Sequence, residues 1–506
     1  MLVLDRLEKN SIEIGSDTAI HSTKGSISYG DLFENSGKLA LWLDLQLGDN
    51  KKPIVVYGHK DPFMVLCFLA CVKSGRAYCP VDASMPMDRI KDIISTVESP
   101  IVLATEELCL EGSEFDRYTI IDSKQINGII NSSDKEISKD KWVKDNEVFY
   151  IIFTSGSTGK PKGVQITYNN LNNFVNWFSD VATTREEKKG KVFLNQAPFS
   201  FDLSVMDLYT CLSNGGTLWA TDKELQWDMT NLMSYIALGN LNYWVSTPSF
   251  ADMCLADKGF NGENFPDMKA FFFCGETLTC ETAKKLLEAF PKAKVINTYG
   301  PTESTVAVTS IEITLDLTTT GKPLPVGKPK QGTIIEIVKP DGSLAEEKES
   351  GEIVIIGDTV SAGYFAEPDK TSKVFSYEDE TKYRTGDEGY MEDGILHFCG
   401  RMDSQIKFHG YRIELGDIEA NLMELPSVQG AVVVTRKSGE KIRNLVGFVI
   451  CDKLSDITDF KRGQEIREQL KVKLPEYMVP KKIVFVDKFP MTTNGKVDRR
   501  KMEESV

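Results

Sequence analysis

The chain has 506 residues, of which 41% are hydrophobic and 26% are charged. This length predicts roughly two to four domains and excludes a single small binding module. The composition is typical of a globular protein and excludes an extended disordered chain. Lys and Arg number 59 and Asp and Glu number 74, so the formal net charge is −15. Because such a chain repels phosphate backbones, we expect no nucleic-acid partner.

The first residues include a charged side chain at Asp5, and they lack the long apolar core of a secretory signal. The longest uninterrupted apolar run, residues 63–72, is much shorter than the roughly 20 residues needed to span a bilayer. The 10 cysteines form no Cys-x-x-Cys pair, and there are only 4 histidines. A disulfide framework, a zinc site and a Ser-His-Asp hydrolase are therefore disfavoured. We expect a cytoplasmic protein without membrane insertion.

Strand-like apolar runs alternate with helical patterns through the first 300 residues. Strands are predicted at residues 53–58, 101–104 and 148–153, and a helix is predicted at 62–74. This alternation favours layers of helices and largely parallel sheets, an α/β fold.

From about Pro323 to Arg401 the pattern changes to short β-type runs separated by turns, which predicts a small, mostly antiparallel, β-barrel-like region. A compact α+β pattern follows, with helices at 417–425 and ending at Pro475, and strands at 431–435, 445–450 and 482–486. We therefore expect a large domain, residues 1–402, and a small domain, residues 403–506. Residues 404–506 have 19 Lys and Arg and 15 Asp and Glu, a net charge of +4, so the rest of the chain carries −19.

The segment 154–163, Thr-Ser-Gly-Ser-Thr-Gly-Lys-Pro-Lys-Gly, directly follows a buried-type strand. Its three glycines allow close backbone approach, its four hydroxyl residues donate hydrogen bonds, and its two lysines supply positive charge. These are the requirements of a polyphosphate-binding loop. The spacing is not that of a Walker loop, so a kinase or ATPase of that type is not supported. The alternative interpretation is an ordinary Ser/Gly-rich surface turn.

Further motifs follow in order: Asn-Thr-Tyr-Gly-Pro-Thr-Glu at 297–303, Gly-Glu-Ile-Val-Ile-Ile-Gly at 351–357, Tyr-Arg-Thr-Gly-Asp at 383–387, a Gly- and charge-rich stretch at 400–419, and Asn-Gly-Lys-Val-Asp-Arg at 494–499. Together with the loop they resemble the adenylate-forming superfamily of acyl-CoA synthetases, luciferase-like enzymes and carrier-loading adenylation domains. The resemblance implies a large N-terminal α/β domain, a small mobile α+β C-terminal domain, and ATP-dependent activation of a carboxylate.

In such enzymes the substrate carboxylate attacks the α-phosphate of ATP. Because both groups are anions, catalysis consists of positioning and charge neutralisation, which suits a chain poor in histidine. The resemblance makes Lys496 the catalytic cation, in contact with both anions, and makes Glu303 a ligand of Mg²⁺. Without the motif, Lys496 would be interpreted as a solvated lysine of the tail.

The same resemblance implies that Tyr299 stacks on adenine and that Thr302 donates its hydroxyl to the α-phosphate. Asp387 would accept hydrogen bonds from both ribose hydroxyls, with Arg401 beside it. The alternative for each is a turn residue. The complete ATP site predicted in this way is Thr154, Ser155, Gly156, Ser157, Thr158, Gly159, Asn297, Thr298, Tyr299, Gly300, Pro301, Thr302, Asp387, Phe398, Arg401 and Lys496.

The predicted substrate pocket contains Asp202, Cys274, Val306 and Lys496. In the amino-acid-activating branch, an aspartate in the Phe-Asp-x-Ser context of Asp202 pairs with the α-ammonium of the substrate; the alternative is a helix N-cap. The surrounding residues resemble the branch whose members load D-alanine onto a carrier protein. There a cysteine like Cys274 narrows the pocket towards the D-enantiomer, whereas the alternative is a buried core thiol.

The resemblance also implies a second half-reaction, transfer to the phosphopantetheine thiol of a D-alanyl carrier protein for D-alanylation of teichoic acids. Asp403 would be the hinge about which the small domain turns, so that Lys496 leaves and the segment 407–414 enters. The +4 domain is a plausible docking surface for an acidic carrier, or simply a solvated basic face. We expect a monomer.

Three other functions stay open on the sequence alone. The chain could activate glycine or L-alanine for peptide assembly, or it could be a CoA ligase for a small carboxylic acid. A catalytically silent nucleotide sensor would keep the fold, but the intact Lys496, Glu303 and Asp387 argue against it.

Overall fold

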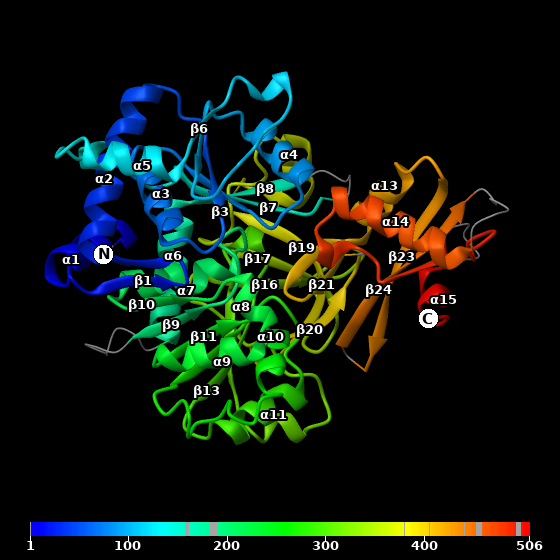
Figure 1. Ribbon diagram of the computed structural model, residues 1–506. Helices are drawn as coiled ribbons and strands as arrows, with labels where there is room; N and C mark the ends of the chain where they lie inside the picture. Colours follow the sequence, from blue (N-terminus) through cyan, green and yellow to red (C-terminus); the bar gives the residue numbers. More distant parts are fainter. Residues whose placement is uncertain are drawn as a thin grey trace. The chain divides into compact units, whose positions relative to one another are not determined.

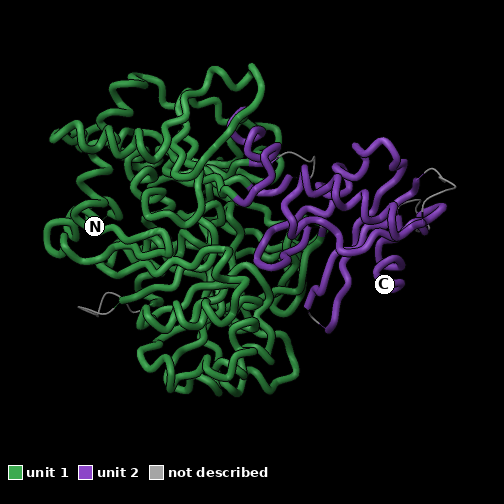
Figure 2. Tube along the Cα trace, in the orientation of Figure 1, with its two compact units in different colours: residues 1–83, 96–153, 163–402 green, residues 84–95, 154–162, 403–506 purple. Residues whose placement is uncertain are grey.

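The computed structural model describes residues 2–156, 161–182, 191–378, 380–403, 405–439, 441–451, 458–491 and 497–506 (Figure 1). The chain divides into two compact units (Figure 2). Unit 1 comprises residues 1–83, 96–153 and 163–402, and unit 2 comprises residues 84–95, 154–162 and 403–506. In the described part of the chain, no helix is both long enough and apolar enough to cross a membrane.

A nine-stranded sheet forms one layer of unit 1, in the order β15-β14-β13-β12-β11-β9-β10-β1-β2. Strands β13 to β1 pair in parallel, and antiparallel strands complete the two edges. β11 and β12 are buried throughout, as expected of parallel strands covered on both faces. The strands are β1 (Thr18–Ser22), β2 (Gly25–Ser28), β9 (Val192–Asn195), β10 (Thr217–Ala220), β11 (Tyr243–Ser246), β12 (Ala270–Phe273), β13 (Lys294–Tyr299), β14 (Thr309–Ile313) and β15 (Lys328–Pro329).

A six-stranded sheet, in the order β6-β5-β3-β4-β7-β8, forms a second layer. Its strands are β3 (Ile54–Gly58), β4 (Tyr78–Asp82), β5 (Ile101–Ala104), β6 (Thr119–Ile121), β7 (Val148–Thr154) and β8 (Lys162–Thr167). β3 pairs in parallel with both β4 and β5. The strands predicted at 53–58, 101–104 and 148–153 are confirmed as β3, β5 and β7.

Helix α3 (Pro62–Lys73) shows why the sequence folds in this way. Asp61 caps its start by accepting the N–H of Phe63, with proline at the first helical position. Every residue of the helix except Phe63 is buried, so the apolar run forms a core helix. The other helices of unit 1 are α1 (Val3–Glu13), α2 (Tyr29–Leu47), α5 (Ser123–Asn131), α6 (Tyr168–Val181), α7 (Leu203–Ser213), α8 (Lys223–Trp227), α9 (Met229–Leu238), α10 (Pro248–Cys254), α11 (Cys280–Ala289) and α12 (Pro368–Val374).

The predicted antiparallel region of unit 1 is confirmed as a five-stranded sheet. β16 (Thr333–Val338), β17 (Gly351–Gly357), β19 (Lys382–Glu392) and β18 (Phe375–Ser376) lie in that order, and β20 (Ile395–Arg401) pairs with β19. Asp393 and Gly394 join β19 to β20 with φ angles of 52° and 72°. Two such residues form the tight turn that suits a hairpin.

Unit 2 has the predicted α+β pattern. The hairpin β21 (Gln405–Phe408) and β22 (Tyr411–Glu414) precedes a three-stranded sheet of β23 (Val428–Ser438), β24 (Lys441–Cys451) and β25 (Lys482–Phe485). Its helices are α13 (Leu415–Met423), α14 (Asp459–Lys473) and α15 (Arg499–Glu503), together with most of α4 (Met87–Val97). Thus α13 begins and ends two residues earlier than predicted.

Candidate functional site

The first group of predicted residues lies where two parallel strands end. β12 and β13 pair with Phe273 opposite Asn297, so the residues after each strand share one edge of the sheet, the edge at which open α/β sheets bind ligands. The Thr298 hydroxyl donates to the Phe273 carbonyl over 2.8 Å. The Asn297 amide donates to the Pro325 carbonyl over 2.9 Å. Asn297 and Thr298 therefore hold the strand ends in place.

After β13 the chain folds back on itself. Thr305 and Val306 have φ angles of 60° and 69°, a conformation that costs about 1–3 kcal/mol for a residue other than glycine. A Cβ atom at Gly300 would lie 2.5 Å from the Cα atom of Ala307, so glycine permits this return. The Cys274 thiol lies 3.5 Å from the Val306 carbonyl oxygen, to which it donates. The structure thus brings together Cys274 and Val306.

Asp387 joins residues from three strands in a buried network. The Tyr299 hydroxyl donates to Oδ2 of Asp387 over 2.6 Å, and Nη1 of Arg401 donates to Oδ1 over 2.6 Å and to the Thr385 carbonyl over 2.8 Å. Burial first, and then the Asp387 carboxylate, raises the pKa of Tyr299 well above its ordinary value, so the hydroxyl stays a donor. The Phe398 ring centroid lies 5.9 Å from that of Tyr299. Four predicted ATP residues are therefore neighbours.

Glu303 lies fully buried in the turn after β13. Its Oε1 accepts the Tyr364 hydroxyl over 2.8 Å, and its carbonyl accepts the Ser361 N–H over 2.8 Å. A carboxylate is an oxygen ligand of the kind that Mg²⁺ takes, and Tyr364 fixes the orientation of one of its oxygens. Across the described residues, His, Cys, Asp and Glu form no cluster of three that could hold a metal ion.

Asp202 stands immediately before α7, in the N-cap position. Its φ and ψ angles of −63° and −28° are already helical, and its side chain makes no capping bond. Asp202 therefore occupies the N-cap position of the alternative interpretation, but its side chain does not cap the helix. Burial first, and the Asp202 carboxylate second, raises the pKa of Tyr150 well above its ordinary value. The buried Tyr150 hydroxyl has no hydrogen-bond partner in the described part of the chain.

The beginning of the predicted phosphate loop belongs to unit 2. The Ser155 hydroxyl donates to the Arg412 carbonyl over 2.7 Å and accepts the backbone N–H of Glu414 over 3.2 Å. The Thr154 hydroxyl donates to the Lys162 carbonyl over 3.5 Å. Within unit 2, Ser155 is thus bonded to strand β22.

The predicted hinge residue, Asp403, lies in unit 2. Asp403 accepts the backbone N–H of Gln405 over 3.0 Å at the first residue of the long segment of unit 2. The predicted residues Ser157, Thr158, Gly159 and Lys496 lie outside the described residues.

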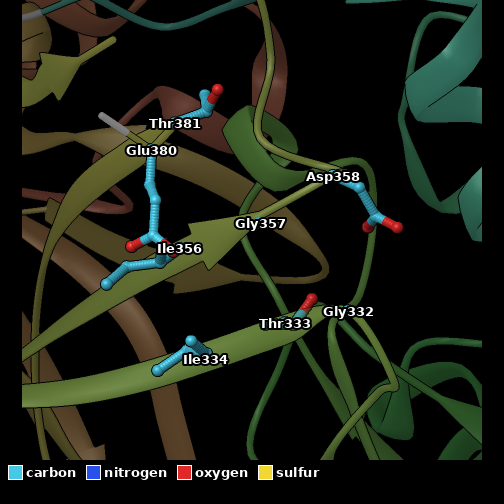
Figure 3. Close-up of a pocket in the computed structure, with 8 residues that line it drawn as sticks. All are labelled: Gly332, Thr333, Ile334, Ile356, Gly357, Asp358, Glu380 and Thr381. Carbon is cyan, nitrogen blue, oxygen red and sulfur yellow. The ribbon is translucent and has the colours of Figure 1, made fainter. Parts of the chain in front are cut away.

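A pocket of unit 1 lies apart from these residues, at the ends of β16 and β17 (Figure 3). It is lined by Gly332, Thr333, Ile334, Ile356, Gly357, Asp358, Glu380 and Thr381. None of the predicted site residues lines this pocket, so it is not part of the candidate site.

Sequence reasoning missed two buried residues: Tyr364, which contacts Glu303, and Lys60, which contacts the segment that precedes Asp202. Tyr364 follows the motif 351–357 but is not part of any recognised motif, so the sequence offered no sign of a role for it in the site. Lys60 is 1% exposed and is the second residue after strand β3. A lysine in that place is a signal in itself, because a buried ammonium needs partners.

The sequence of the chain is similar to those of known proteins. Residues 8–365 match the AMP-binding enzyme family, and residues 417–496 match the AMP-binding enzyme C-terminal domain. The D-alanine–D-alanyl carrier protein ligase of Bacillus cytotoxicus is 45% identical over 507 residues, which cover 100% of both chains.

Solved structures share the fold. The o-succinylbenzoate CoA synthetase of Bacillus subtilis is 19% identical, with a TM-score of 0.83 over 99% of this chain and 98% of that one. The Vibrio cholerae adenylation domain AlmE, solved with glycyl-adenosine-5'-phosphate, is 21% identical, with a TM-score of 0.83 over 99% of this chain and 96% of that one. The predicted fold class, a layered α/β domain with a small α+β domain, is confirmed.

Proposed function

Because the chain belongs to the AMP-binding enzyme family, we propose that it is an AMP-forming ligase that activates D-alanine and transfers it to a D-alanyl carrier protein. The observation that carries this proposal is the 45% identity to a D-alanine–D-alanyl carrier protein ligase over the whole length of both chains. In the first half-reaction a carboxylate oxygen of D-alanine bonds to the α-phosphorus of ATP as the bond to pyrophosphate breaks. In the second, the phosphopantetheine sulfur of the carrier bonds to the acyl carbon, the thiol gives up its proton, and AMP leaves.

The residues around Asp387 are proposed to bind the nucleoside. Its two oxygens already accept hydrogen bonds from Tyr299 and Arg401, which supports an acceptor role towards the two ribose hydroxyls. Tyr299 and Phe398 would contact adenine. Lys496 would bring its positive charge to the substrate carboxylate and the α-phosphate, where two anions must approach each other.

Mg²⁺ would be held at Glu303 together with phosphate oxygens of ATP. The fit is favourable, because Glu303 is a carboxylate with one oxygen oriented by Tyr364 and oxygen is the ligand that this hard cation prefers. When bound, the metal ion would neutralise phosphate charge. Thr302, next to Glu303, would donate to the α-phosphate.

The amino-acid pocket is proposed to lie between Asp202 and the strained turn at Val306. Asp202 stands directly before α7, and its carboxylate would pair with the α-ammonium of D-alanine. Cys274, whose thiol lies 3.5 Å from the Val306 carbonyl oxygen, would limit the space around the substrate methyl group. The strain at Thr305 and Val306 is of the kind found at ligand-binding sites.

The second half-reaction would need a rearranged site. We place its hinge at Asp403, with the hairpin 405–414 supplying residues for transfer. Gly410, with a φ of 80° between β21 and β22, carries no side chain, which would let the pantetheine arm pass close to the backbone at that residue. The net charge of +4 on residues 404–506 would attract an acidic carrier.

The cellular setting follows from the same proposal. D-alanine loaded on its carrier would serve D-alanylation of teichoic acids, and the enzyme would act in the cytoplasm as a monomer.

Exchange of labelled pyrophosphate into ATP tests the first half-reaction. The purified chain is assayed with D-alanine, L-alanine, glycine and propionate, each titrated to saturation. We expect kcat/KM for D-alanine to exceed the others by at least about tenfold, because one methyl position in a shaped pocket is worth about 1–3 kcal/mol. Equal values for D- and L-alanine would refute D-selectivity, whereas a preference for glycine would favour the function suggested by the AlmE complex.

Loading of the carrier tests the second half-reaction. The phosphopantetheinylated carrier and the same carrier without its arm are incubated with the enzyme, ATP and radioactive D-alanine. We expect a hydroxylamine-labile label on the first carrier alone. Label on CoA in place of the carrier would instead support a CoA ligase.

A further inference from the structure

Lys60 is a buried lysine at the carboxyl end of β3, a central strand of the six-stranded sheet. Its φ is 51°, an uncommon backbone conformation for a residue with a Cβ atom. The residue before it, His59, is bonded through both ring nitrogens. Nε2 accepts the backbone N–H of Lys223 over 3.0 Å, so Nδ1 carries the proton and donates to Asp82 over 2.7 Å. The two hydrogen bonds of the His59 ring therefore hold in place the turn on which Lys60 lies.

The Lys60 ammonium contacts residues at and after the end of β9, a strand of the nine-stranded sheet. Nζ donates to the side-chain oxygen of Asn195 and to the carbonyl of Ala197, and it lies 3.2 Å from the carbonyl oxygen of Asn195. An ammonium has three N–H donors, so these acceptors match its capacity. The centroid of the Phe199 ring lies 4.9 Å from Nζ. All of these contacts fall within residues 195–199.

Asp207 anchors the same segment from the following helix. The Asn195 side-chain amide donates to Oδ1 of Asp207 over 2.8 Å, and Asp207 is 0% exposed on α7. In the sequence, Asp202 lies between the segment 195–199, which Lys60 contacts, and Asp207; it stands directly before α7. Its position therefore depends on how firmly residues 195–199 and α7 are held.

This arrangement is costly to disturb because it is buried. Burial lowers the pKa of Lys60 to about 7, and the Asp207 carboxylate has the largest opposing effect among the carboxylates that favour the charged form. If the ammonium were removed, the carbonyl of Ala197 and the oxygens of Asn195 would lose a donor inside the core. Buried acceptors without donors carry a desolvation cost. The segment would relieve that cost by shifting.

We propose that Lys60 is a positioning residue of the amino-acid pocket, which holds residues 195–199 so that Asp202 meets the ammonium of the substrate. This inference rests on the proposed function, in which Asp202 pairs with that ammonium. The residues predicted to bind adenine and ribose lie on β13, β19 and β20. Loss of Lys60 should therefore weaken the use of the amino acid much more than the use of ATP.

The test compares Lys60→Met with Lys73→Met in the pyrophosphate-exchange assay, with the full-length chain. Lys73 is a matched control, because it is 1% exposed and burial lowers its pKa to about 7 as well. Its ammonium donates to the Phe33 carbonyl over 2.5 Å and lies 3.3 Å from the centroid of the Phe33 ring. It touches neither the segment 195–199 nor any predicted site residue.

For Lys60→Met we expect KM for D-alanine to rise about 10- to 100-fold, because a misplacement of a positioned group by about 1 Å can cost about 100-fold. KM for ATP should stay within about twofold of the wild type. Lys60→Gln keeps an amide donor at the same place and should show a smaller rise. KM does not depend on the fraction of active enzyme, so partial unfolding leaves the measurement valid. If Lys60→Met does not fold, Lys60→Gln alone decides the question.

Two outcomes would overturn the proposal. One is an unchanged KM for D-alanine in the Lys60 variants, and the other is an equal rise of both KM values, which would indicate a merely structural role. A KM for D-alanine that rises as much in Lys73→Met would count against it for the same reason. Failure of the proposed function is distinct from these results, because in that case the wild-type chain itself would not exchange pyrophosphate with D-alanine.

Discussion

Replacement of Asp387 by asparagine tests the proposed ribose site most directly. The side chain keeps its shape and one acceptor oxygen but loses its charge. The remaining oxygen should face Arg401, because two donors repel each other, while the new amide group can donate to the Tyr299 hydroxyl oxygen. Asp387 is 2% exposed, so water cannot replace the lost acceptor easily.

The magnitude follows from the two hydrogen bonds that the Asp387 carboxylate is proposed to accept from the ribose hydroxyls. A hydrogen bond to a charged group contributes about 1.5–3 kcal/mol and a neutral one about 0.5–1.5 kcal/mol. Neutralising Asp387 should therefore weaken each of two ribose bonds by about 1 kcal/mol. A total of about 2 kcal/mol corresponds to a rise of roughly 30-fold in KM for ATP. KM for D-alanine should change by less than about twofold, since Asp202 and Cys274 do not contact this network.

The assay is an ATP titration of pyrophosphate exchange at saturating D-alanine, accompanied by thermal unfolding of each variant. Asp358→Asn is the matched control: Asp358 pairs with Lys330 beside the pocket of Figure 3, and its side chain is 41% exposed. The control should keep the wild-type KM for ATP. If Asp387→Asn also keeps that KM, within about twofold, the ribose-binding role of Asp387 is refuted.

Three further predictions concern other parts of the molecule. Tyr364→Phe removes the hydroxyl that donates to Glu303; we expect the Mg²⁺ concentration for half-maximal exchange to rise about fivefold, and an unchanged Mg²⁺ titration would contradict this role. Cys274→Ala enlarges the space beside Val306, so the preference for D- over L-alanine should fall about tenfold; an equal preference in the variant and the wild type would remove Cys274 from the pocket. Burial lowers the pKa of Lys73 to about 7, below its value in the unfolded chain, so above about pH 7 only the unfolded state binds this proton and stability rises with pH. Urea unfolding should therefore show the wild type gaining up to about 1.4 kcal/mol per pH unit over Lys73→Met between roughly pH 7.5 and 9, and parallel pH profiles would show that the pKa of Lys73 is not lowered.

Local patterns in the sequence predicted much of the fold. The apolar run 62–74 could only be a core helix, and capping by Asp61 fixed its start, so α3 agrees with the prediction to within one residue. The short β-type runs separated by turns between about Pro323 and Arg401 predicted an antiparallel sheet, which β16 to β20 form. These features depend on neighbours in the sequence, and such neighbours are visible without a structure.

Contacts between distant residues could not be predicted in this way. Asp202 has the sequence context of a helix cap, and only the observed backbone shows that its side chain does not cap α7. Tyr364 and Glu303 are 61 residues apart, and Lys60 and Asn195 are 135 residues apart. No local pattern relates the members of either pair, because the sheets bring them together.

The amino-acid sequence by itself determined the family, the order of the motifs and the chemical type of each predicted site residue. It did so because close backbone approach, hydrogen-bond donation and charge are properties of residue types at short spacings. Only the tertiary structure decided which of these side chains share a network and what supports them. Tyr299 and Arg401 end strands β13 and β20 and meet Asp387 in the middle of β19. Residues 195–199 are held by a lysine that follows a strand of another sheet. A buried charge is stable only where the fold supplies its partners, so the contacts of Lys60 with residues 195–199 are what indicate its role.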